Sequence, residues 1–480
     1  MKKVVLINPP EIKFQITKDP MPPLGLAMLA AMLEREKIPV CIIDGALERF
    51  DVNSLIEAVK AQQPDIIGIT GTTWNRFDSF ETARRLRKVF PSVPIVYGGP
   101  HATFTPEDTL TNLPEVDIIV RGEAEYSFLN LINAIFKGEP LDDIKGIAFR
   151  KNGKVIVNPP HPLIENLDDL PLAARHLLDI PRYNEQLFGK KSTTIMTSRG
   201  CPVECVYCST SKLWGKSHRC RSPQLVCDEI EYLIETYGIE SVWFFDDTLT
   251  LRKSHIEGLI DEIEKRKLRF TWYAEVRVNT VNYELLKKMR HAGCTYISFG
   301  VESGAPRILD IIDKGIKLEQ VDKVIDWCNE LGIKMKAFFM LGLPEETVEE
   351  AKITIDVIKK YKKKVKFIAL AGGTSILPGT KMHIWATQKG YFPKDFSWVK
   401  PYYNVQNPTI GRDPRLPTLI QPQMGYKELR NLNFLASDKL IRMKRIKKRL
   451  KKYYDPREIL KDIILVTSAL SFKMKETLKK

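Results

Sequence analysis

Short apolar runs alternate with amphipathic stretches through the first part of the chain. Runs such as VVLIN, PVCIID, DIIGIT and VDIIV end in turn residues, and the segments between them, such as LGLAMLAAMLE at residues 24–34, have apolar positions at helical spacing. Buried strands that alternate with helices are typical of a parallel sheet covered on both faces. The pattern predicts an α/β, doubly wound (Rossmann-like) domain over residues 1–143.

The same alternation restarts further along the chain and runs over residues 192–397. Six apolar strands, from TTIMTSR to VKFIALAGG, are separated by five helical segments. This repetition predicts a partial (β/α)6 barrel of the TIM type, with its active site at the carboxyl ends of the strands. We predict a Pro-rich linker with a small hairpin over residues 144–191 and a helical C-terminal region over residues 398–480.

Glycine and hydroxyl residues gather where strands of the first predicted sheet end. They form TGTT at Thr70–Thr73, GGPH at Gly98–His101 and RGE at Arg121–Glu123. Ligands of doubly wound sheets lie at this edge, and glycine lets the backbone approach a ligand closely. Each loop alone is equally compatible with a tight turn, but three on one edge indicate a large ligand.

Composition adds limits to this picture. The chain has 480 residues, 44% of them hydrophobic and 28% charged. This length exceeds what one hydrophobic core usually supports, and the balance is typical of a folded protein. No apolar run approaches the ~20 residues of a membrane span, and the first apolar run is too short for a secretory signal. We therefore expect a cytoplasmic protein.

The net charge of +15 is concentrated near the C-terminus. Nine Lys or Arg residues and no acid lie within Lys439–Lys452. Apolar residues at helical spacing among them are Leu440, Met443, Ile446 and Leu450. Such a helix is able to lie on an anionic membrane, which would make the protein membrane-peripheral, or to touch nucleic acid, the least favoured of the readings. It is equally compatible with a solvated face beside a packed stripe.

Three of the eight cysteines are close together in the stretch SRGCPVECVYCS. Cys201, Cys205 and Cys208 have the spacing CxxxCxxC, which can hold three corners of a cubane cluster and leave the fourth iron free for a substrate. A zinc site would need a fourth ligand, such as His218 or Cys220. An electron-transfer protein would normally hold all four irons.

This stretch directly follows the first strand of the predicted barrel, and it resembles the radical S-adenosylmethionine (radical SAM) superfamily. The matching residues are Arg199, Gly200, Cys201, Cys205, Tyr207 and Cys208. The resemblance implies a [4Fe-4S] cluster whose free iron is chelated by the amino and carboxylate groups of SAM. It further implies an electron donor such as ferredoxin or flavodoxin, and cleavage of SAM to a 5′-deoxyadenosyl radical.

The resemblance also implies SAM-binding residues at the ends of later barrel strands, besides Tyr207. Asp246 would hold the amino group, Glu275 and Arg277 the ribose and carboxylate, and Ser298 and Glu302 offer further polar contacts. The stretch GLPEET after the fifth strand would face the adenine. Each acid is also compatible with a helix cap.

The first domain narrows the class of radical SAM protein. The stretches PPLGLAMLAAMLE, GGPHATFTPE and VDIIVRGEAEYSFLNLI resemble the cobalamin-binding domain of the class that includes anaerobic magnesium-protoporphyrin cyclase and many C-methyltransferases (class B). With the barrel, the resemblance covers Lys3–Phe392. The residues that it places around cobalamin are Asn8, Leu24, Gly25, Thr70, Gly71, Thr72, Gly98, Gly99, Arg121, Gly122 and Glu123.

One departure from other corrinoid proteins concerns the lower face of cobalt. Their DxHxxG pattern is absent, and IIDGA at Ile42–Ala46 has no histidine. His101 and Trp74 lie on the expected edge of the sheet. We do not assign His101 as a ligand, because a histidine in a Gly-Pro turn more often bonds to backbone.

The implied activity is methylation of an unactivated carbon, which consumes two SAM molecules for each methyl group. A cobalamin-dependent cyclase or rearranging enzyme stays open as the alternative. A transfer RNA methylthiotransferase is disfavoured because its first domain carries three cysteines, whereas Cys41 stands alone here. A corrinoid or SAM sensor would not need the cysteine trio. Lipid, peptide, tetrapyrrole and other small-molecule substrates all stay open.

Overall fold

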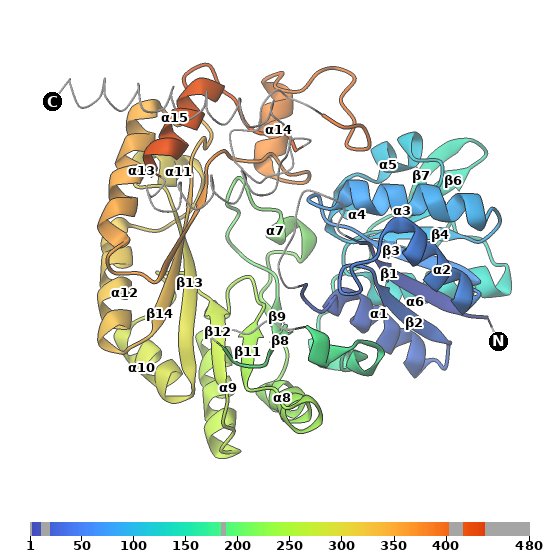
Figure 1. The fold of residues 1–480 in the computed structure, drawn as a ribbon, viewed down its shortest axis with the longest axis horizontal. Helices are drawn as coiled ribbons and strands as arrows, with labels where there is room; N and C mark the ends of the chain where they lie inside the picture. Colours follow the sequence, from blue (N-terminus) through green and yellow to red (C-terminus); the bar gives the residue numbers. More distant parts are fainter. Residues whose placement is uncertain (1, 11–19, 184–188, 403–415, 437–480) are drawn as a thin grey trace, which may run out of the picture.

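The computed structural model describes residues 2–10, 20–183, 189–402 and 416–436. Figure 1 shows two α/β bodies side by side, with the short helix α7 (Thr210–Leu213) between them. The basic segment at residues 439–452 lies outside the described residues, so its predicted helix and membrane contact stay predictions. Within the described part of the chain, no helix is long and apolar enough to cross a membrane.

The first body is built on a seven-stranded sheet with the order β2-β1-β3-β4-β5-β6-β7. The first five strands are parallel, as predicted, and the last two are antiparallel. The hairpin predicted in the linker is β6–β7, and it extends this sheet. The strands are β1 (Val4–Asn8), β2 (Val40–Asp44), β3 (Ile66–Thr70), β4 (Ile95–Gly98), β5 (Ile118–Val120), β6 (Ile147–Lys151) and β7 (Lys154–Val157).

Helices cover both faces of this sheet because its central strands are apolar on both sides. In β1, Val4 and Leu6 pack into one hydrophobic cluster while Val5 and Ile7 pack into the other, as strand alternation requires. Helices α1 (Leu24–Arg35) and α6 (Ala124–Lys137) cover the first face. The second face is covered by α2 (Val52–Gln62), α3 (Arg76–Val89), α4 (Pro100–Phe104) and α5 (Pro106–Asn112).

The second body is a parallel six-stranded sheet with the order β15-β14-β13-β12-β11-β8. Its edge strands β8 and β15 do not pair, so it is the predicted partial barrel. The strands are β8 (Ser192–Ile195), β11 (Ser241–Phe244), β12 (Thr271–Glu275), β13 (Cys294–Glu302), β14 (Lys334–Met340) and β15 (Phe367–Ala371). The helices between them are α8 (Pro223–Tyr237), α9 (Lys253–Lys265), α10 (Tyr283–His291), α11 (Pro306–Ile311), α12 (Leu318–Glu330) and α13 (Val348–Tyr361).

The linker packs against both bodies. Ala174 donates a backbone hydrogen bond to Ala27 in α1 at 3.0 Å. Arg175 forms an ion pair with Glu229 in α8 at 2.7 Å, and both side chains are buried. Tyr183 donates to the Asp44 carboxylate at the end of β2 at 2.6 Å. The linker therefore fixes the two bodies relative to one another.

The chain returns to the first body after the barrel. Beyond α14 (Lys381–Gln388), the return segment Ser397–Val399 reaches α3 and α5. Arg76 donates to the Trp398 carbonyl at 3.1 Å, and the Trp398 amide donates to Asp108 at 2.8 Å. Val399 is buried in the core of the first body. Of the predicted helical C-terminal region, the described part contains α15 (Tyr426–Ala436), which packs on α13.

Candidate active site

The three cysteines lie on one loop between β8 and α8. Cys201 and Cys205 are buried, at 9% and 6% exposure, and Cys208 is partly exposed. Burial raises the pKa of the Cys201 and Cys208 thiols, and each pKa is raised further by a neighbouring cysteine of the trio. The three thiols therefore lie close enough to influence one another electrostatically. Buried thiols become thiolate ligands when a positive metal centre compensates for the lost solvation.

A turn at residues 312–315, between α11 and α12, supports this loop from below. Val206 donates its amide to the Ile312 carbonyl at 3.1 Å, and the Cys205 thiol approaches the Asp313 carbonyl at 3.6 Å. Lys314 contacts the Tyr207 hydroxyl at 3.2 Å. Sequence reasoning missed this turn, because it lies between two helices and belongs to no strand end.

The two aspartates after β11 separate in the structure. Asp246, the predicted SAM contact, is buried and accepts hydrogen bonds from Thr197 and Ser198. Burial raises the pKa of Asp246 to about 6. Asp247 is exposed instead, and it accepts from Thr210, two residues after Cys208, at 2.9 Å. Sequence reasoning missed Asp247.

Glu275, at the carboxyl end of β12, lies opposite Ser298, which is in the middle of β13 and not at its predicted place at the strand end. The Ser298 hydroxyl donates to Glu275, and the Tyr273 hydroxyl bonds to both, at 2.7 Å. Tyr273 also stacks on Trp243, with ring centroids 4.8 Å apart, and lies edge-on to Tyr296 at 4.9 Å. These rings fill the barrel interior below the polar groups. We call Trp243, Tyr273 and Tyr296 the aromatic floor, because their rings lie beneath Glu275 and Ser298.

Glu302 and Arg277 both reach the supporting turn. Glu302 is buried, forms an ion pair with Lys314 at 2.8 Å and adopts a left-handed φ of 68°. Arg277 donates to the Lys314 carbonyl. Arg277 lies two residues beyond the end of β12 at Glu275, as its predicted place at a strand end requires. The structure therefore brings Tyr207, Arg277 and Glu302 together around one turn.

The alternative zinc ligands do not complete a metal site. His218 Nδ1 lies 3.4 Å from the Cys220 sulfur. Cys220 pairs in a strand with Ser198, at the base of the loop. Within the described ranges, no group of three His, Cys, Asp or Glu side chains is arranged to hold a metal ion. Neither His218 nor Cys220 therefore joins the three cysteines as a fourth ligand among the described residues.

A cavity of about 470 Å³ lies between the two bodies. Its walls come from the carboxyl edge of the first sheet, from the linker and from the base of the cysteine loop, including Ser198 and Arg199. The residues predicted around cobalamin that line it are Asn8, Leu24, Gly25, Thr70, Gly71, Thr72, Gly98, Gly99 and Gly122. A Cβ atom at Gly25 or Gly122 would meet nothing within 4 Å, so both leave room for a ligand.

Two residues predicted around cobalamin do not line this cavity. Arg121 donates to the Asn158 carbonyl at 2.6 Å. Glu123 forms an ion pair with Arg219 of the barrel body at 2.5 Å. The sequence placed both residues on the correct edge of the sheet. It did not show that their side chains bind to other groups of the protein.

His101 and Trp74 do not line the cavity either. His101 is fully buried, and its Nδ1 lies 3.0 Å from the Thr73 hydroxyl, so the expected backbone partner was wrong. Burial holds the pKa of His101 well below its usual range. Its ring packs against Trp398 of the return segment. The contacts of His101 are therefore structural.

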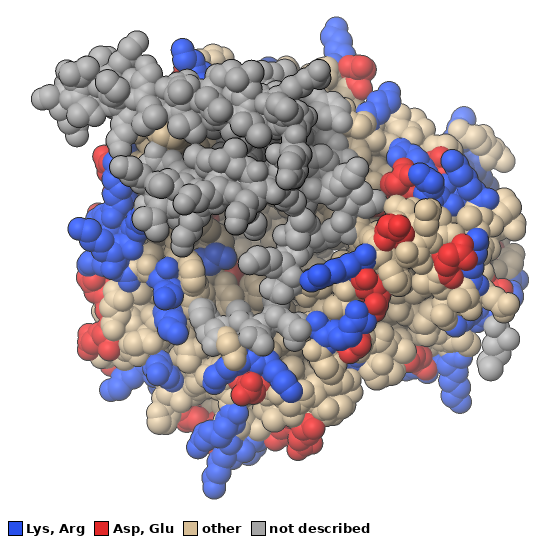
Figure 2. All heavy atoms as spheres, in the orientation of Figure 1, with Lys and Arg blue, Asp and Glu red and all other residues tan. Residues whose placement is uncertain are grey.

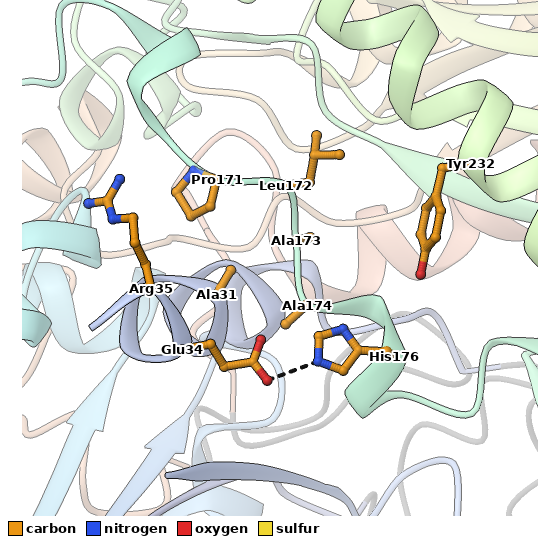
Figure 3. A pocket seen from close by; sticks show the side chains of 9 residues that line it. All are labelled: Ala31, Glu34, Arg35, Pro171, Leu172, Ala173, Ala174, His176 and Tyr232. Carbon is orange, nitrogen blue, oxygen red and sulfur yellow. Dashed lines mark hydrogen bonds and ion pairs between the residues drawn. The ribbon is translucent and has the colours of Figure 1, made fainter. Parts of the chain in front are cut away.

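A second cavity, of about 350 Å³, opens elsewhere on the surface. Figure 3 shows it where α1, the linker and α8 meet, with the ring of His176 2.9 Å from the Glu34 carboxylate. It contains none of the predicted site residues. The cavity between the two bodies is therefore the one that adjoins the candidate chemistry.

Comparison with known proteins identifies both bodies. A family model described as the radical SAM superfamily matches residues 195–358, and one described as the B12 binding domain matches residues 17–132. A Pyrococcus horikoshii protein, the uncharacterized methyltransferase PH0819, is 40% identical over 75% of this chain and 78% of its own length. The chain belongs to the B12-binding radical SAM proteins.

Two further comparisons give a more distant relative and a solved structure of the same fold. The anaerobic magnesium-protoporphyrin IX monomethyl ester cyclase of Rubrivivax gelatinosus is 30% identical over 71% of this radical SAM protein and 62% of its own length. The solved structure of the cobalamin-dependent radical enzyme OxsB has a TM-score of 0.74 and 19% identity, and the match covers 99% of this chain and 71% of that one. At this low identity, the similarity to OxsB shows that the two chains have the same fold.

The cofactors of this radical SAM protein are a [4Fe-4S] cluster, SAM and cobalamin. The residues present fit them. Three free thiols lie on one short loop, and the glycine-edged cavity lies beside the base of that loop. Apolar walls with few polar groups are typical of cavities that bind large organic cofactors.

Proposed function

We propose that this enzyme methylates a carbon atom of its substrate, with cobalamin as the methyl carrier. The observation that carries the proposal is a shared wall. Ser198 and Arg199 line the cobalamin cavity, and Cys201 follows two residues after Arg199. The two cofactors would therefore lie on opposite sides of one strand end. The relative with 40% identity carries the name uncharacterized methyltransferase, which agrees with this proposal.

The cysteine loop also carries charges that suit SAM. Arg277 lowers the pKa of Cys201 and Asp247 raises it, although burial has the larger effect, so a cation and an anion both lie near this thiol. The amino acid end of SAM has one carboxylate and one ammonium group. Arg277 and Asp247 would orient these groups toward the free iron by charge.

Bound cofactors supply the difficult chemistry: the cluster provides the electron that splits SAM, and cobalamin carries the methyl group. The chain's own residues provide position and exclude water. The aromatic floor formed by Trp243, Tyr273 and Tyr296 closes the barrel below Glu275. A reactive radical at the mouth is then shielded from solvent on that side.

The experiment is an anaerobic assay of the reconstituted full chain with cobalamin, a strong reductant and SAM whose methyl group is deuterated. 5′-Deoxyadenosine reports radical cleavage, and S-adenosylhomocysteine reports departure of the methyl group. We expect both products, and transfer of the label to a component of a cell extract. Cys205→Ala should abolish 5′-deoxyadenosine.

A cyclase or rearranging enzyme would give a different result. It would form 5′-deoxyadenosine without S-adenosylhomocysteine, and no component of the extract would gain the deuterated methyl group. This outcome would overturn methyl transfer while leaving radical SAM chemistry intact.

A further inference from the structure

The cysteine loop begins and ends in a short antiparallel ladder. Strand β9 (Ser198–Arg199) pairs with β10 (Arg219–Cys220), and the register places Arg199 opposite Arg219. Gly200 follows with φ at 96°, and a Cβ atom there would lie 2.0 Å from the Ser217 carbonyl oxygen. The ladder and this close approach fix the point from which the loop emerges.

Both arginines of the ladder are held by glutamates of the first body. Arg199 forms an ion pair with Glu125 at 2.5 Å, and the two side-chain nitrogens of Arg219 bind the two carboxylate oxygens of Glu123 at 3.0 and 2.5 Å. All four side chains are at most 7% exposed. We call these four residues the clasp.

The clasp lies at the wall between the two cofactor sites. Glu123 caps α6 and Glu125 is in its first turn, whereas Arg199 lies two residues before Cys201. Glu125 and Arg199 also line the cobalamin cavity. Ile164 of the linker also contacts the clasp. The Ile164 amide donates to Glu123 at 2.7 Å, and the Ile164 carbonyl accepts from Arg219. Three separate parts of the chain therefore meet here.

Stability alone does not explain such a cluster. Removing two arginines and two carboxylates from water costs about as much as their attraction returns, so apolar residues would stabilise the fold equally well. The clasp is also incompletely satisfied: Arg199 Nη1 and Glu125 Oε2 are buried and have no hydrogen-bond partner among the residues that the structure describes. What paired arginine and carboxylate groups do supply is one defined geometry.

We propose that Arg199 and Arg219, held by Glu125 and Glu123, are positioning residues that keep the cysteine loop in register with the cobalamin cavity. The inference rests on the proposed function, because only methyl transfer requires this register. In that transfer the S–CH3 bond breaks, the bonding electron pair stays on sulfur, and S-adenosylhomocysteine remains. Reduced cobalamin, the acceptor that the cavity would hold, would supply the electron pair of the new bond to the methyl group.

Radical cleavage of SAM does not require the register. One electron from the reduced cluster breaks the S–C5′ bond, methionine leaves, and the deoxyadenosyl radical takes a hydrogen atom to give 5′-deoxyadenosine. Both reacting partners in this step are held by the barrel body. A shifted clasp should therefore lower the formation of S-adenosylhomocysteine and leave the formation of 5′-deoxyadenosine nearly unchanged.

The experiment compares Arg219→Lys and Glu123→Gln with the wild type, in the reconstituted full chain without air and with cobalamin, SAM and a strong reductant. Lysine keeps the charge of Arg219 but loses the two-pronged contact. We expect S-adenosylhomocysteine formation to fall about tenfold or more, since small misplacements of reacting groups have effects of that size. 5′-Deoxyadenosine formation should stay within about twofold of the wild type on the same argument.

The matched control is Glu262→Gln, which removes another buried carboxylate. Glu262 pairs with Arg266 on α9, away from both cofactor sites, at 2.7 Å. In Glu262→Gln, the ratio of S-adenosylhomocysteine to 5′-deoxyadenosine should equal that of the wild type. If both products fall equally in the clasp variants, or if the ratio is unchanged, the proposal is overturned.

A second measurement needs no turnover. Hydrogen–deuterium exchange of peptides from the cysteine loop should be faster in Arg219→Lys than in the wild type or Glu262→Gln, and cobalamin titrations should show weaker binding. Unchanged exchange would overturn the clasp. A wild type that makes 5′-deoxyadenosine but no S-adenosylhomocysteine would overturn the proposed function instead, and the exchange data would still decide the clasp.

Discussion

Asp246 and Asp247 are adjacent in the sequence but have different surroundings. Along β11, Phe244 packs in the outer core and Trp243 stacks inside the barrel. Both aspartates lie in the turn beyond the end of this strand, where Asp246 contacts Thr197 and Ser198 and Asp247 contacts Thr210. The sequence predicted an acid after this strand. It gave no means of distinguishing the two, because neither position belongs to the alternating strand.

We predict that Asp247→Asn weakens SAM binding by about tenfold, the loss expected for one hydrogen bond to a charged group. Equilibrium binding of SAM to the reconstituted protein measures this. Glu257→Gln, on the outer surface of α9, is the control and should bind SAM like the wild type. Wild-type affinity in Asp247→Asn would contradict the role given to this carboxylate.

A second prediction concerns Glu346, which is fully buried in the GLPEET stretch. Burial raises its pKa from 4.5 to about 8, although the Gly342 and Leu343 amides donate to it. As pH rises from 4.5, the unfolded chain releases this proton first, so folding stability falls until about pH 8. Glu346→Gln should remove that loss, so its free energy of unfolding at pH 8 should be about 4 kcal/mol higher than that of the wild type.

Denaturant unfolding at several pH values measures this difference. Below pH 4.5 both proteins carry a neutral side chain at this position, and the two free energies of unfolding should converge. A difference that does not depend on pH would show that the carboxyl does not titrate as proposed.

At the scale of elements, Gly200 sets the start of the cysteine loop. Gly200→Ala should abolish cluster assembly for two reasons. The new methyl group would clash with the Ser217 carbonyl oxygen, and the φ of residue 200 is 96°, a value that residues with a side chain rarely adopt. Iron and sulfide content of the reconstituted protein measure this. Gly238 also has a positive φ, at 65°, but open space around it. Gly238→Ala should therefore assemble a cluster, and normal iron content in Gly200→Ala would refute the constraint.

The sequence predicted strands and helices well because each buries a continuous apolar face. The six barrel strands and the first five strands of the first sheet follow directly from such runs. Helix α11 and the supporting turn at residues 312–315 were missed, because they are short and their contacts with Tyr207 and Arg277 come from distant parts of the chain. Likewise, the pairing of Arg199 with Glu125 joins residues that no local pattern relates.

At the scale of the whole molecule, charge is distributed without a dominant patch on the visible face. Figure 2 shows Lys and Arg interspersed with Asp and Glu over both bodies. The sequence placed the basic excess in the segment at residues 439–452, outside the described residues. The organisation into two bodies was predictable from the restart of strand-helix alternation, whereas the linker's role as a wall of the cavity was not.

The last prediction tests how the two bodies are held together. Trp398→Ala should lower the free energy of unfolding by about 3 kcal/mol, as expected for truncation of a buried tryptophan, and should separate the unfolding of the first body from that of the barrel. Scanning calorimetry measures both effects. Trp385→Ala, in α14 and packed on Tyr391, removes a ring without reaching the first body and is the control. A single unshifted transition in Trp398→Ala would contradict the prediction.

The return segment has a consequence for how the protein is made. Val399 completes a hydrophobic core whose first strand begins at Val4. Domains generally fold as units while the ribosome is still working, beginning from the N-terminus. Here the core of the body that is synthesised first is completed by a residue that is translated after the last strand of the barrel.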